Sequence, residues 1–333
     1  MNPVRCWLLV GLLVACATGC ARKETAPVQK PAGPRKVVLQ TDWFPQAEHG
    51  GFYQALAKGF YADAGLDVEI WPGGPGAGIK LKVARGDADF GMMRSDDLLL
   101  AAGSGMPLVM VAASLQHDPM GLMVHDESPV KTFKDLAGRA VVGNVGMAYF
   151  PFLERKFGVK FERRQTSFGI GEFLADPTLI QQCMATNEPF FAQQNGRRVR
   201  TLLLTSAGYD CYHAIFTRRE LTRTEPTMVR AFVHATIRGW RDYLENDPAP
   251  ADNLILRRNP QMTQALLTFA RSELIIHAFA RGRWENGEDI GQLSLARISE
   301  QMELLLQLKV MELPVSIASM ATKEFLPPAP RQP

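Results

Sequence analysis

The sequence predicts an α/β fold of two lobes that are joined by two extended segments. Three observations predict this class. Residues 37–70 read as a strand, a loop, a helix and a second strand. Residues 140–149 begin the same order again, and an apolar run at 212–217 is placed to carry the chain back to its first half. Strands that alternate with helices are typical of parallel sheets.

The first unit shows the pattern in full. An alternating apolar run at 37–41 predicts a strand, and Pro45 ends it because proline cannot donate to a strand ladder. Apolar residues at every fourth position from Phe52 to Phe60 predict a helix with one buried face. Residues 66–70 then alternate between apolar and acidic side chains, which predicts a second strand.

Polar and aromatic residues gather after the first strand: Asp42, Trp43, Glu48, His49 and Tyr53. In open α/β sheets, ligands bind in the crevice at this end of the strands. An indole stacks on a flat ring, and carboxylates accept hydrogen bonds from ring N–H or amino groups. The set therefore suits a planar, nitrogen-rich heterocycle. A structural role fits equally well, with Trp43 covering the core and Glu48 favoured by the helix dipole.

The glycine-rich stretch 71–78 leads into a helix that carries Ile79 and Val83. Such a loop before a helix can hold an anion. This one lacks the ending of a phosphate-binding loop and the spacing of a dinucleotide fingerprint. A plain turn is therefore the favoured interpretation.

The next two strands provide a further wall for the site. Residues 86–92 predict a tight turn and a short buried strand, after which Ser95 or Asp96 caps a helix. The continuous apolar run at 107–115 predicts a strand that is covered on both faces, and Gln116 follows it. Ser95 and Gln116 thus stand at strand ends and join the candidate ligand-binding residues.

The second lobe repeats the order of strand, loop and helix. A short capped helix is expected at 132–139 and a strand at 140–143, followed by a loop into another helix. A further strand-like piece ends just before Pro189, and another strand is expected at 199–204. The strand ends of this lobe add four candidate ligand-binding residues: Asn144, Tyr149, Asn187 and Glu188.

Residues 121–125 and 212–217 are expected to form a two-strand hinge between the lobes. Proline-bounded helices follow at 227–244, 260–269 and 293–308, behind the first lobe, and an extended tail at 325–328. The predicted division of the chain is a lipoprotein signal peptide and lipobox at 1–20, a flexible tether at 21–36, lobe 1 at 37–122 and 216–326, and lobe 2 at 123–215.

The N-terminal stretch has the pattern of a bacterial lipoprotein signal. Arg5 gives a short basic region, and the apolar segment after it is too short to span a bilayer. Leu-Val-Ala-Cys ends at Cys16 and matches a lipobox well, whereas the match that ends at Cys20 is weaker. We expect lipidation at Cys16, with Cys20 as the alternative. Residues 21–36 are polar and proline-containing, as in a flexible linker.

Composition excludes several classes of function. The chain has 333 residues with a formal net charge of +3, which gives no reason to expect a nucleic-acid partner. The six histidines are scattered without metal-ligand spacing, so no metal is expected. No cofactor is expected either, because no lysine lies in the predicted site loops and the cysteines are few and dispersed. Beyond the signal only Cys183 and Cys211 remain. They could pair in an oxidising compartment, and the sequence leaves that question open.

Several segments in order carry a resemblance to a known family. They are the signal and tether, DWFPQAEHGGFYQALAKGFYADAGLDVEI, GDADFG, KTFKDLAGRAVV, NEPF, RGWRDYL and KEFLP. Together they resemble the NMT1/THI5-like periplasmic binding proteins, over about residues 36–327. The resemblance implies a type II periplasmic binding fold, in which two α/β lobes close on a ligand and deliver it to the permease of an ABC importer.

The resemblance also implies a ligand class. The family's best-known ligands are pyrimidine precursors of thiamine, and some branches resemble riboflavin binders. On this basis Trp43 and Tyr149 would provide aromatic surfaces, and the carboxylates would accept hydrogen bonds from the ligand. The lipid anchor would hold the protein at the periplasmic face of the inner membrane. We expect Asp42, Glu48 and Glu188 to accept hydrogen bonds from the ligand. We expect His49, Ser95 and Asn187 to orient the edge of the ligand.

Alternatives remain beside this hypothesis. Aromatic walls suit flavins as well as pyrimidines, and Arg94 could pair with an acidic substituent such as a sulfonate. An enzyme of the pyrimidine-synthesis type is disfavoured, because the cysteine-rich CCCFC-type segment of the eukaryotic relatives is absent and no lysine lies in the predicted site loops. A scaffold or sensor domain without a ligand would lack groups such as Asp42, Trp43 and Glu188.

Overall fold

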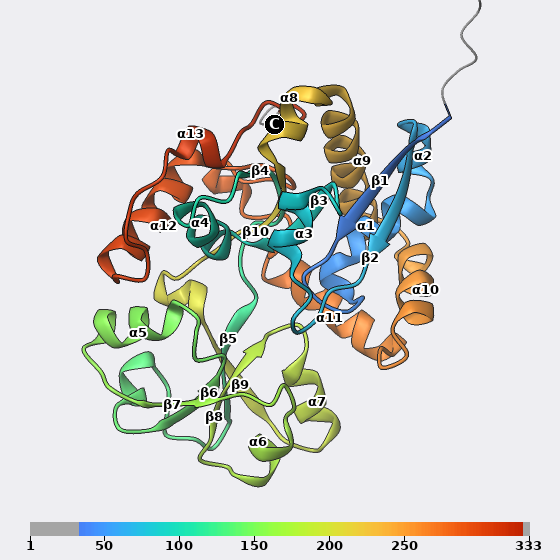
Figure 1. The fold of residues 1–333 in the computed structure, drawn as a ribbon. Helices are drawn as coiled ribbons and strands as arrows, with labels where there is room; N and C mark the ends of the chain where they lie inside the picture. Colours follow the sequence, from blue (N-terminus) through green and yellow to red (C-terminus); the bar gives the residue numbers. More distant parts are fainter. Residues whose placement is uncertain (1–32, 329–333) are drawn as a thin grey trace, which may run out of the picture. The chain divides into compact units, whose positions relative to one another are not determined.

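The computed structural model describes residues 33–328 of the chain. The predicted signal peptide, Cys16, Cys20 and nearly all of the predicted tether lie outside the described residues. Within them the chain forms two five-stranded sheets with helices packed against each (Figure 1). We call the elements around sheet A lobe 1 and those around sheet B lobe 2. The strands of sheet A are β1 (Arg35–Gln40), β2 (Leu66–Trp71), β3 (Phe90–Arg94), β4 (Leu108–Leu115) and β10 (His213–Arg218), and those of sheet B are β5 (Met120–His125), β6 (Ala140–Gly143), β7 (Glu162–Gln165), β8 (Ile180–Met184) and β9 (Val199–Leu203).

The two sheets share one topology. The strand order is β2-β1-β3-β10-β4 in sheet A and β7-β6-β8-β5-β9 in sheet B. In each sheet three parallel strands are followed by one antiparallel strand. That strand is β10 in lobe 1, which arrives from lobe 2, and β5 in lobe 2, which arrives from lobe 1. In each lobe, the antiparallel strand is therefore the first strand that the chain forms after it crosses from the other lobe.

The chain crosses between the lobes at residues 116–119 and again at 208–212. Strands β5 and β10 each pair with two neighbours inside their own sheet. The lobe boundaries predicted after residues 122 and 215 therefore fall inside β5 and β10. The sequence shows that residues 121–125 and 212–217 are extended and apolar, but it does not show which of the two sheets each segment joins.

The burial of strand β4 explains why Ser114 is its one polar residue. All its side chains are buried. Leu108 and Met110 belong to one core cluster, whereas Val109 and Val111 belong to the other. Alternate residues of a strand face opposite sides of a sheet, so both faces of sheet A are covered here.

Helices cover both faces of sheet A. Figure 1 shows α1, α2, α9 and α10 on one side and α4, α12 and α13 on the other. The helices of lobe 1 are η1 (a 3₁₀ turn, Ala47–His49), α1 (Gly50–Ala57), α2 (Phe60–Asp63), α3 (Ile79–Arg85), α4 (Ser95–Gly103), α8 (Arg219–Thr224), α9 (Pro226–Glu245), α10 (Ala249–Arg258), α11 (Gln264–Ile276), η4 (Trp284–Asn286), α12 (Leu295–Gln307) and α13 (Ile317–Met320); those of lobe 2 are η2 (Phe133–Leu136), α5 (Tyr149–Phe157), α6 (Gly171–Ala175), α7 (Glu188–Gln194) and η3 (Leu204–Ala207).

Several elements differ from the sequence prediction. Strand β7 was not predicted, because its residues Glu-Arg-Arg-Gln form a polar edge strand without apolar alternation. Helix α10 was also missed. Helix α11 starts later than the predicted residue 260, where Thr263 accepts a hydrogen bond from the backbone N–H of Leu266. The tail is not simply extended, since the N–H of Leu326 closes a turn onto Lys323.

Helices α1 and α9 approach closely because both carry glycine at the contact. A Cβ atom at Gly50 would lie 2.1 Å from the ring of Tyr243, and one at Gly51 would lie 2.2 Å from the ring of Trp240. A Cβ at Gly239 would lie 2.2 Å from the carbonyl oxygen of Gly51. The 20-residue helix α9 therefore fixes α1, and with it the loop that precedes α1.

We expect Gly239→Ala to lower the free energy of unfolding by roughly 1–3 kcal/mol, because the added methyl group must displace backbone in a packed core. Urea denaturation measures this directly. Gly171→Ala is the matched control, since a Cβ there would meet nothing within 4 Å. Equal stabilities of the two variants would contradict the account of this helix contact.

Candidate functional site

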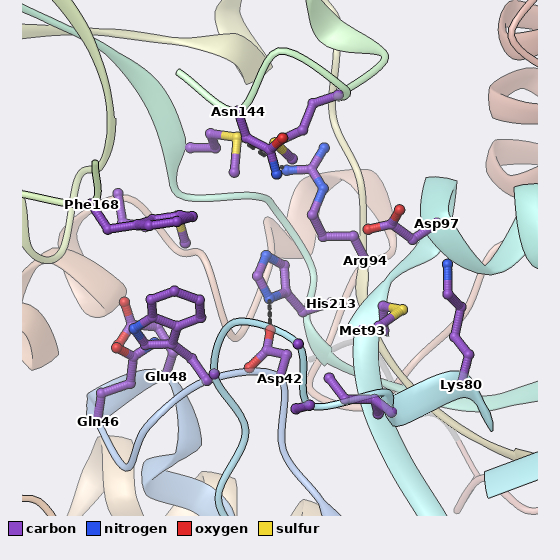
Figure 2. Close-up of a pocket in the computed structure, with 18 of the residues that line it drawn as sticks. Asp42, Gln46, Glu48, Lys80, Met93, Arg94, Asp97, Asn144, Phe168 and His213 are labelled. Carbon is purple, nitrogen blue, oxygen red and sulfur yellow. Dashed lines mark hydrogen bonds and ion pairs between the residues drawn. The ribbon is translucent and has the colours of Figure 1, made fainter. Parts of the chain in front are cut away.

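A cleft of about 580 Å³ lies between the two lobes. Figure 2 shows residues of both lobes facing into it. Its wall includes strand ends, the loop before α1, the glycine-rich loop before α3 and the loop before α6. Six of the predicted ligand-binding residues line it: Asp42, Trp43, Glu48, Asn144, Asn187 and Glu188.

The loop after β1 presents Trp43 to the cleft. The hydroxyl of Thr41 donates to the carbonyl oxygen of Trp43 at 3.0 Å, and the N–H of Gly73 donates to the same oxygen at 2.9 Å. A Cβ at Gly73 would lie 2.3 Å from the Thr41 carbonyl oxygen, so only glycine permits this approach. Asn259 Nδ2 holds the other end of the loop by donating to the Pro45 carbonyl oxygen.

Phe168 of lobe 2 projects into the cleft (Figure 2), and its ring lies against that of Trp43 of lobe 1. The two ring centroids are 5.6 Å apart and the rings are tilted by 46°. Phe168 is 57% exposed and has a φ of 61°, a region that a non-glycine residue rarely adopts. Gln181 Nε2 fixes its loop by donating to the Gly169 carbonyl oxygen at 2.9 Å. The second aromatic surface is thus Phe168 and not the predicted Tyr149.

Two carboxyl groups from opposite lobes lie at the same end of the cleft. Glu48 is buried, and the hydroxyl of Thr186 in lobe 2 donates to its carboxylate. Glu188 starts α7 and accepts a hydrogen bond from the N–H of Met184 at 2.7 Å. Burial, with a smaller contribution from Glu48, raises the pKa of Glu188 to about 7. Its carboxyl group therefore titrates near neutral pH.

Asp42 lies between two histidines. His49 Nε2 is 2.8 Å from one carboxylate oxygen, and His213 Nδ1 is 3.6 Å from the other. Burial opposes the charge on His213, but the carboxylates of Asp118 and Asp42 outweigh it and raise its pKa to about 9. Burial likewise acts against ionised Asp42, yet hydrogen bonds from the two histidines keep its pKa below the usual value. This part of the cleft is an ion-paired network at neutral pH.

Arg94 lines the cleft, but its donors point into the protein. Its Nε and one terminal nitrogen bind Asp96, at 3.2 and 3.0 Å. The other terminal nitrogen binds Asp118 and lies 3.4 Å from the sulfur of Met120. The remaining contact is with the sulfur of Cys211 at 3.2 Å. The guanidinium group has five N–H donors, so these five contacts use all of them.

Five predicted site residues lie outside the cleft wall. His49 supports Asp42 from behind, and Tyr53 is buried in the core of lobe 1. Ser95 donates to Gln301 and accepts from the Tyr212 N–H. Gln116 donates to two backbone carbonyl groups of the C-terminal segment. Tyr149 is fully buried and donates to Gln182 Oε1 at 2.9 Å, which places it under the Asn144 loop.

Several residues that line the cleft were not predicted from the sequence. Phe168 follows an unpredicted strand, and His213 was assigned only to the returning strand. Lys80 stands in the helix after the glycine-rich loop, so the argument that the site loops contain no lysine does not describe the whole cleft. Methionine carries no positional signal of its own in a sequence. Five methionines line the cleft: Met93, Met106, Met120, Met147 and Met184.

Other predictions concern groups away from the cleft. Cys183 and Cys211 are both buried and free, so they do not form the disulfide that the sequence left open. In residues 33–328 no group of three or more His, Cys, Asp or Glu side chains is placed to hold a metal ion. Among the helices of the same residues, none combines the length and apolar character that a membrane crossing needs.

We expect Arg94→Met to lower the free energy of unfolding by about 3–5 kcal/mol, because it leaves Asp96 buried without its cation and leaves Asp118 with His213 alone. Arg198→Met is the control, since Arg198 is 79% exposed and its ion pair with Asp126 is a surface contact. Urea denaturation compares the two. A loss for Arg94→Met that is no larger than for Arg198→Met would contradict the assignment.

Comparisons with known proteins identify relatives and similar folds. Riboflavin-binding protein RibY of Chloroflexus aurantiacus is 25% identical over 96% of this chain and 96% of its own. The 4-amino-5-hydroxymethyl-2-methylpyrimidine phosphate synthase of Legionella pneumophila is 25% identical over 69% of this chain and 76% of its own. The periplasmic aliphatic sulphonate binding protein SsuA of Escherichia coli covers 86% of this chain and 91% of its own, with a TM-score of 0.63 at 14% identity.

The likeness to SsuA shows the fold alone and confirms the predicted two-lobe, type II periplasmic binding fold. The family model described as NMT1/THI5 like matches residues 46–251, well over half of the chain. The chain belongs to the NMT1/THI5-like family.

Proposed function

We propose that this chain is the substrate-binding protein of an ABC importer and that it binds a planar nitrogen heterocycle between its lobes. The observation that carries the proposal is the pair of facing rings, Trp43 from lobe 1 and Phe168 from lobe 2. Glu48 and Glu188 line the same cleft. A ligand that contacts both lobes stabilises the closed state, because only that state offers both sets of contacts.

The charges of the cleft favour a ligand that donates hydrogen bonds. The carboxyl groups of Glu48 and Glu188 have oxygens that can accept from amino or ring N–H groups. Arg94, by contrast, has no donor left for an acidic substituent, because Asp96, Asp118 and two sulfur atoms take them all. This arrangement does not support the pairing of Arg94 with a sulfonate.

Within this class we propose a pyrimidine precursor of thiamine, of the hydroxymethylpyrimidine or formylaminopyrimidine type. Its amino group can donate hydrogen bonds to the acceptors beside Trp43. A riboflavin-type ligand is the second candidate. A volume of about 580 Å³ favours it, since this lies within the range of sites that hold drug-sized molecules. The similarity to RibY extends over nearly the whole chain.

We propose a binding role and not a catalytic one. The CCCFC-type segment of the eukaryotic pyrimidine-synthesising relatives is absent from this sequence. Lys80 does line the cleft, so the absence of a lysine in the site loops no longer supports this choice. A cofactor absorption band in the purified protein would favour the enzyme. We further propose lipidation at Cys16, or at Cys20, which would hold the protein at the periplasmic face of the inner membrane.

Titration calorimetry with hydroxymethylpyrimidine, thiamine and riboflavin tests the proposal. For the ligand that binds, Trp43→Ala is expected to lose roughly 1–3 kcal/mol of binding free energy, the scale of one aromatic stack. Trp284→Ala is the control, because that indole is not part of the cleft wall. Unchanged affinity in Trp43→Ala would remove this residue from the site, and failure of all three ligands to bind would count against the proposed class.

The pKa of Glu188 predicts a pH dependence. Below pH 7 its carboxyl group is mostly protonated, and above pH 7 it is ionised and a stronger acceptor for a ligand N–H. For a ligand that does not itself titrate between pH 6 and pH 8, affinity should rise about three- to tenfold over this range. Calorimetry at both pH values measures it.

Glu188→Gln should abolish this pH dependence, whereas Glu172→Gln should retain it, because Glu172 is an exposed acid outside the cleft. A pH dependence that persists in Glu188→Gln would show that another group causes it.

A further inference from the structure

Lys80 is a cation of the cleft with a free ammonium group. It extends from the first turn of α3, lines the cleft and is half-buried. Among residues 33–328 no carboxylate lies within ion-pair distance of it and no hydrogen bond engages it, whereas Lys82 on the same helix donates to Gln40 Oε1 at 2.9 Å. Lys80 therefore forms no ion pair with the described part of the protein.

The other two cations of the cleft wall differ from Lys80 in this respect. Arg94 directs its five donors to Asp96, Asp118 and two sulfur atoms. His213 lies between Asp118 and Asp42, at 3.2 and 3.6 Å. An anionic group that enters the cleft would find these charges already compensated. Lys80 is the cation that remains for it.

The glycine-rich loop sets the position of Lys80. Gly74, Gly76 and Gly78 all have positive φ, and the loop forms part of the cleft wall. Gly73 packs directly on the backbone of Thr41 and Asp42, so the loop is held against the strand end that carries the site. The turn predicted from the sequence thus has a function in placing a side chain at the cleft.

Lys80 and the facing rings lie on opposite sides of the cleft. In Figure 2, Phe168 and Glu48 are on one side, Lys80 and Asp97 are on the other, and His213 and Asp42 lie between them. Trp43 lies against Phe168. Asp97 lies beyond ion-pair distance of Lys80, and burial and the neighbouring Asp96 raise the pKa of Asp97. The cleft therefore has acceptors for N–H groups at the rings and a cation at the far side.

We propose that the ligand of this cleft is a planar heterocycle with an anionic arm, a phosphomonoester, and that Lys80 binds the arm while Trp43 and Phe168 enclose the ring. A lysine ammonium binds phosphate as a point charge and needs no fixed fork geometry. The volume of about 580 Å³ leaves room for an arm beside the ring. This proposal rests on the proposed function and names a narrower ligand class for it.

Matched ligand pairs test the proposal by calorimetry. Riboflavin and FMN differ by one phosphomonoester, as do thiamine and thiamine monophosphate. For the ring system that binds, we expect the phosphorylated member to bind roughly three- to tenfold more tightly at low salt, the scale of a half-exposed ion pair. The preference should decline as salt is added, because salt screens a charge that is open to solvent.

Two variants separate a direct contact from a general effect of charge. Lys80→Gln should abolish the preference for the phosphorylated member. Lys82→Gln removes the same charge two residues away, outside the cleft wall, and should retain the preference.

The outcomes distinguish this proposal from the proposed function. If the unphosphorylated rings bind and phosphate brings no gain, or if Lys80→Gln keeps the gain, the assignment of Lys80 is wrong and the heterocycle-binding function stands. If neither ring system binds in either form, the proposed function fails, and the assignment of Lys80 fails with it.

Discussion

The buried guanidinium group of Arg94 is the interaction on which the arrangement of the lobes depends. Arg94 ends β3 of sheet A and binds Asp118, which lies in the first crossing between the lobes. It also lies 3.2 Å from the sulfur of Cys211 in the second crossing. Both connections are thereby held to one strand end. Burial alone would oppose the charges, but the ion pairs outweigh it, so the pKa of Asp118 stays below its usual value. A buried ion pair of this kind is costly to break, and it specifies one geometry.

Around that fixed point, two contacts between the lobes lie at the Glu48 end of the cleft. Thr186 of lobe 2 donates to the buried carboxylate of Glu48 in lobe 1, and the rings of Trp43 and Phe168 meet beside it. The rings are 5.6 Å apart, which is less than a stacked ligand between them requires. A ring that enters must therefore separate them. Phe168, exposed and in a strained backbone conformation, is the partner that can move, whereas the Trp43 loop is held by hydrogen bonds at both ends.

The sequence predicted lobe 1 better than lobe 2, for physical reasons. Strands with a clear period, such as β2 and β4, and the residues just after β1 could be located because burial imposes a pattern. Strand β7 has no such pattern, and Phe168 follows it, so the second ring of the site could not be found. Tyr149 was chosen in its place from a different loop of the cleft wall, but its side chain turns inward to Gln182. Whether a residue at a strand end faces the cleft or the core depends on tertiary packing, which a single sequence does not contain.

The central claim is that a planar ligand is bound between Trp43 and Phe168. The most direct measurement is a crystal structure of the protein with hydroxymethylpyrimidine or riboflavin bound. The account predicts the ligand ring between the indole and the phenyl ring, with its N–H groups directed to Glu48 or Glu188. A ligand bound elsewhere, with the two aromatic rings still in contact, would contradict it.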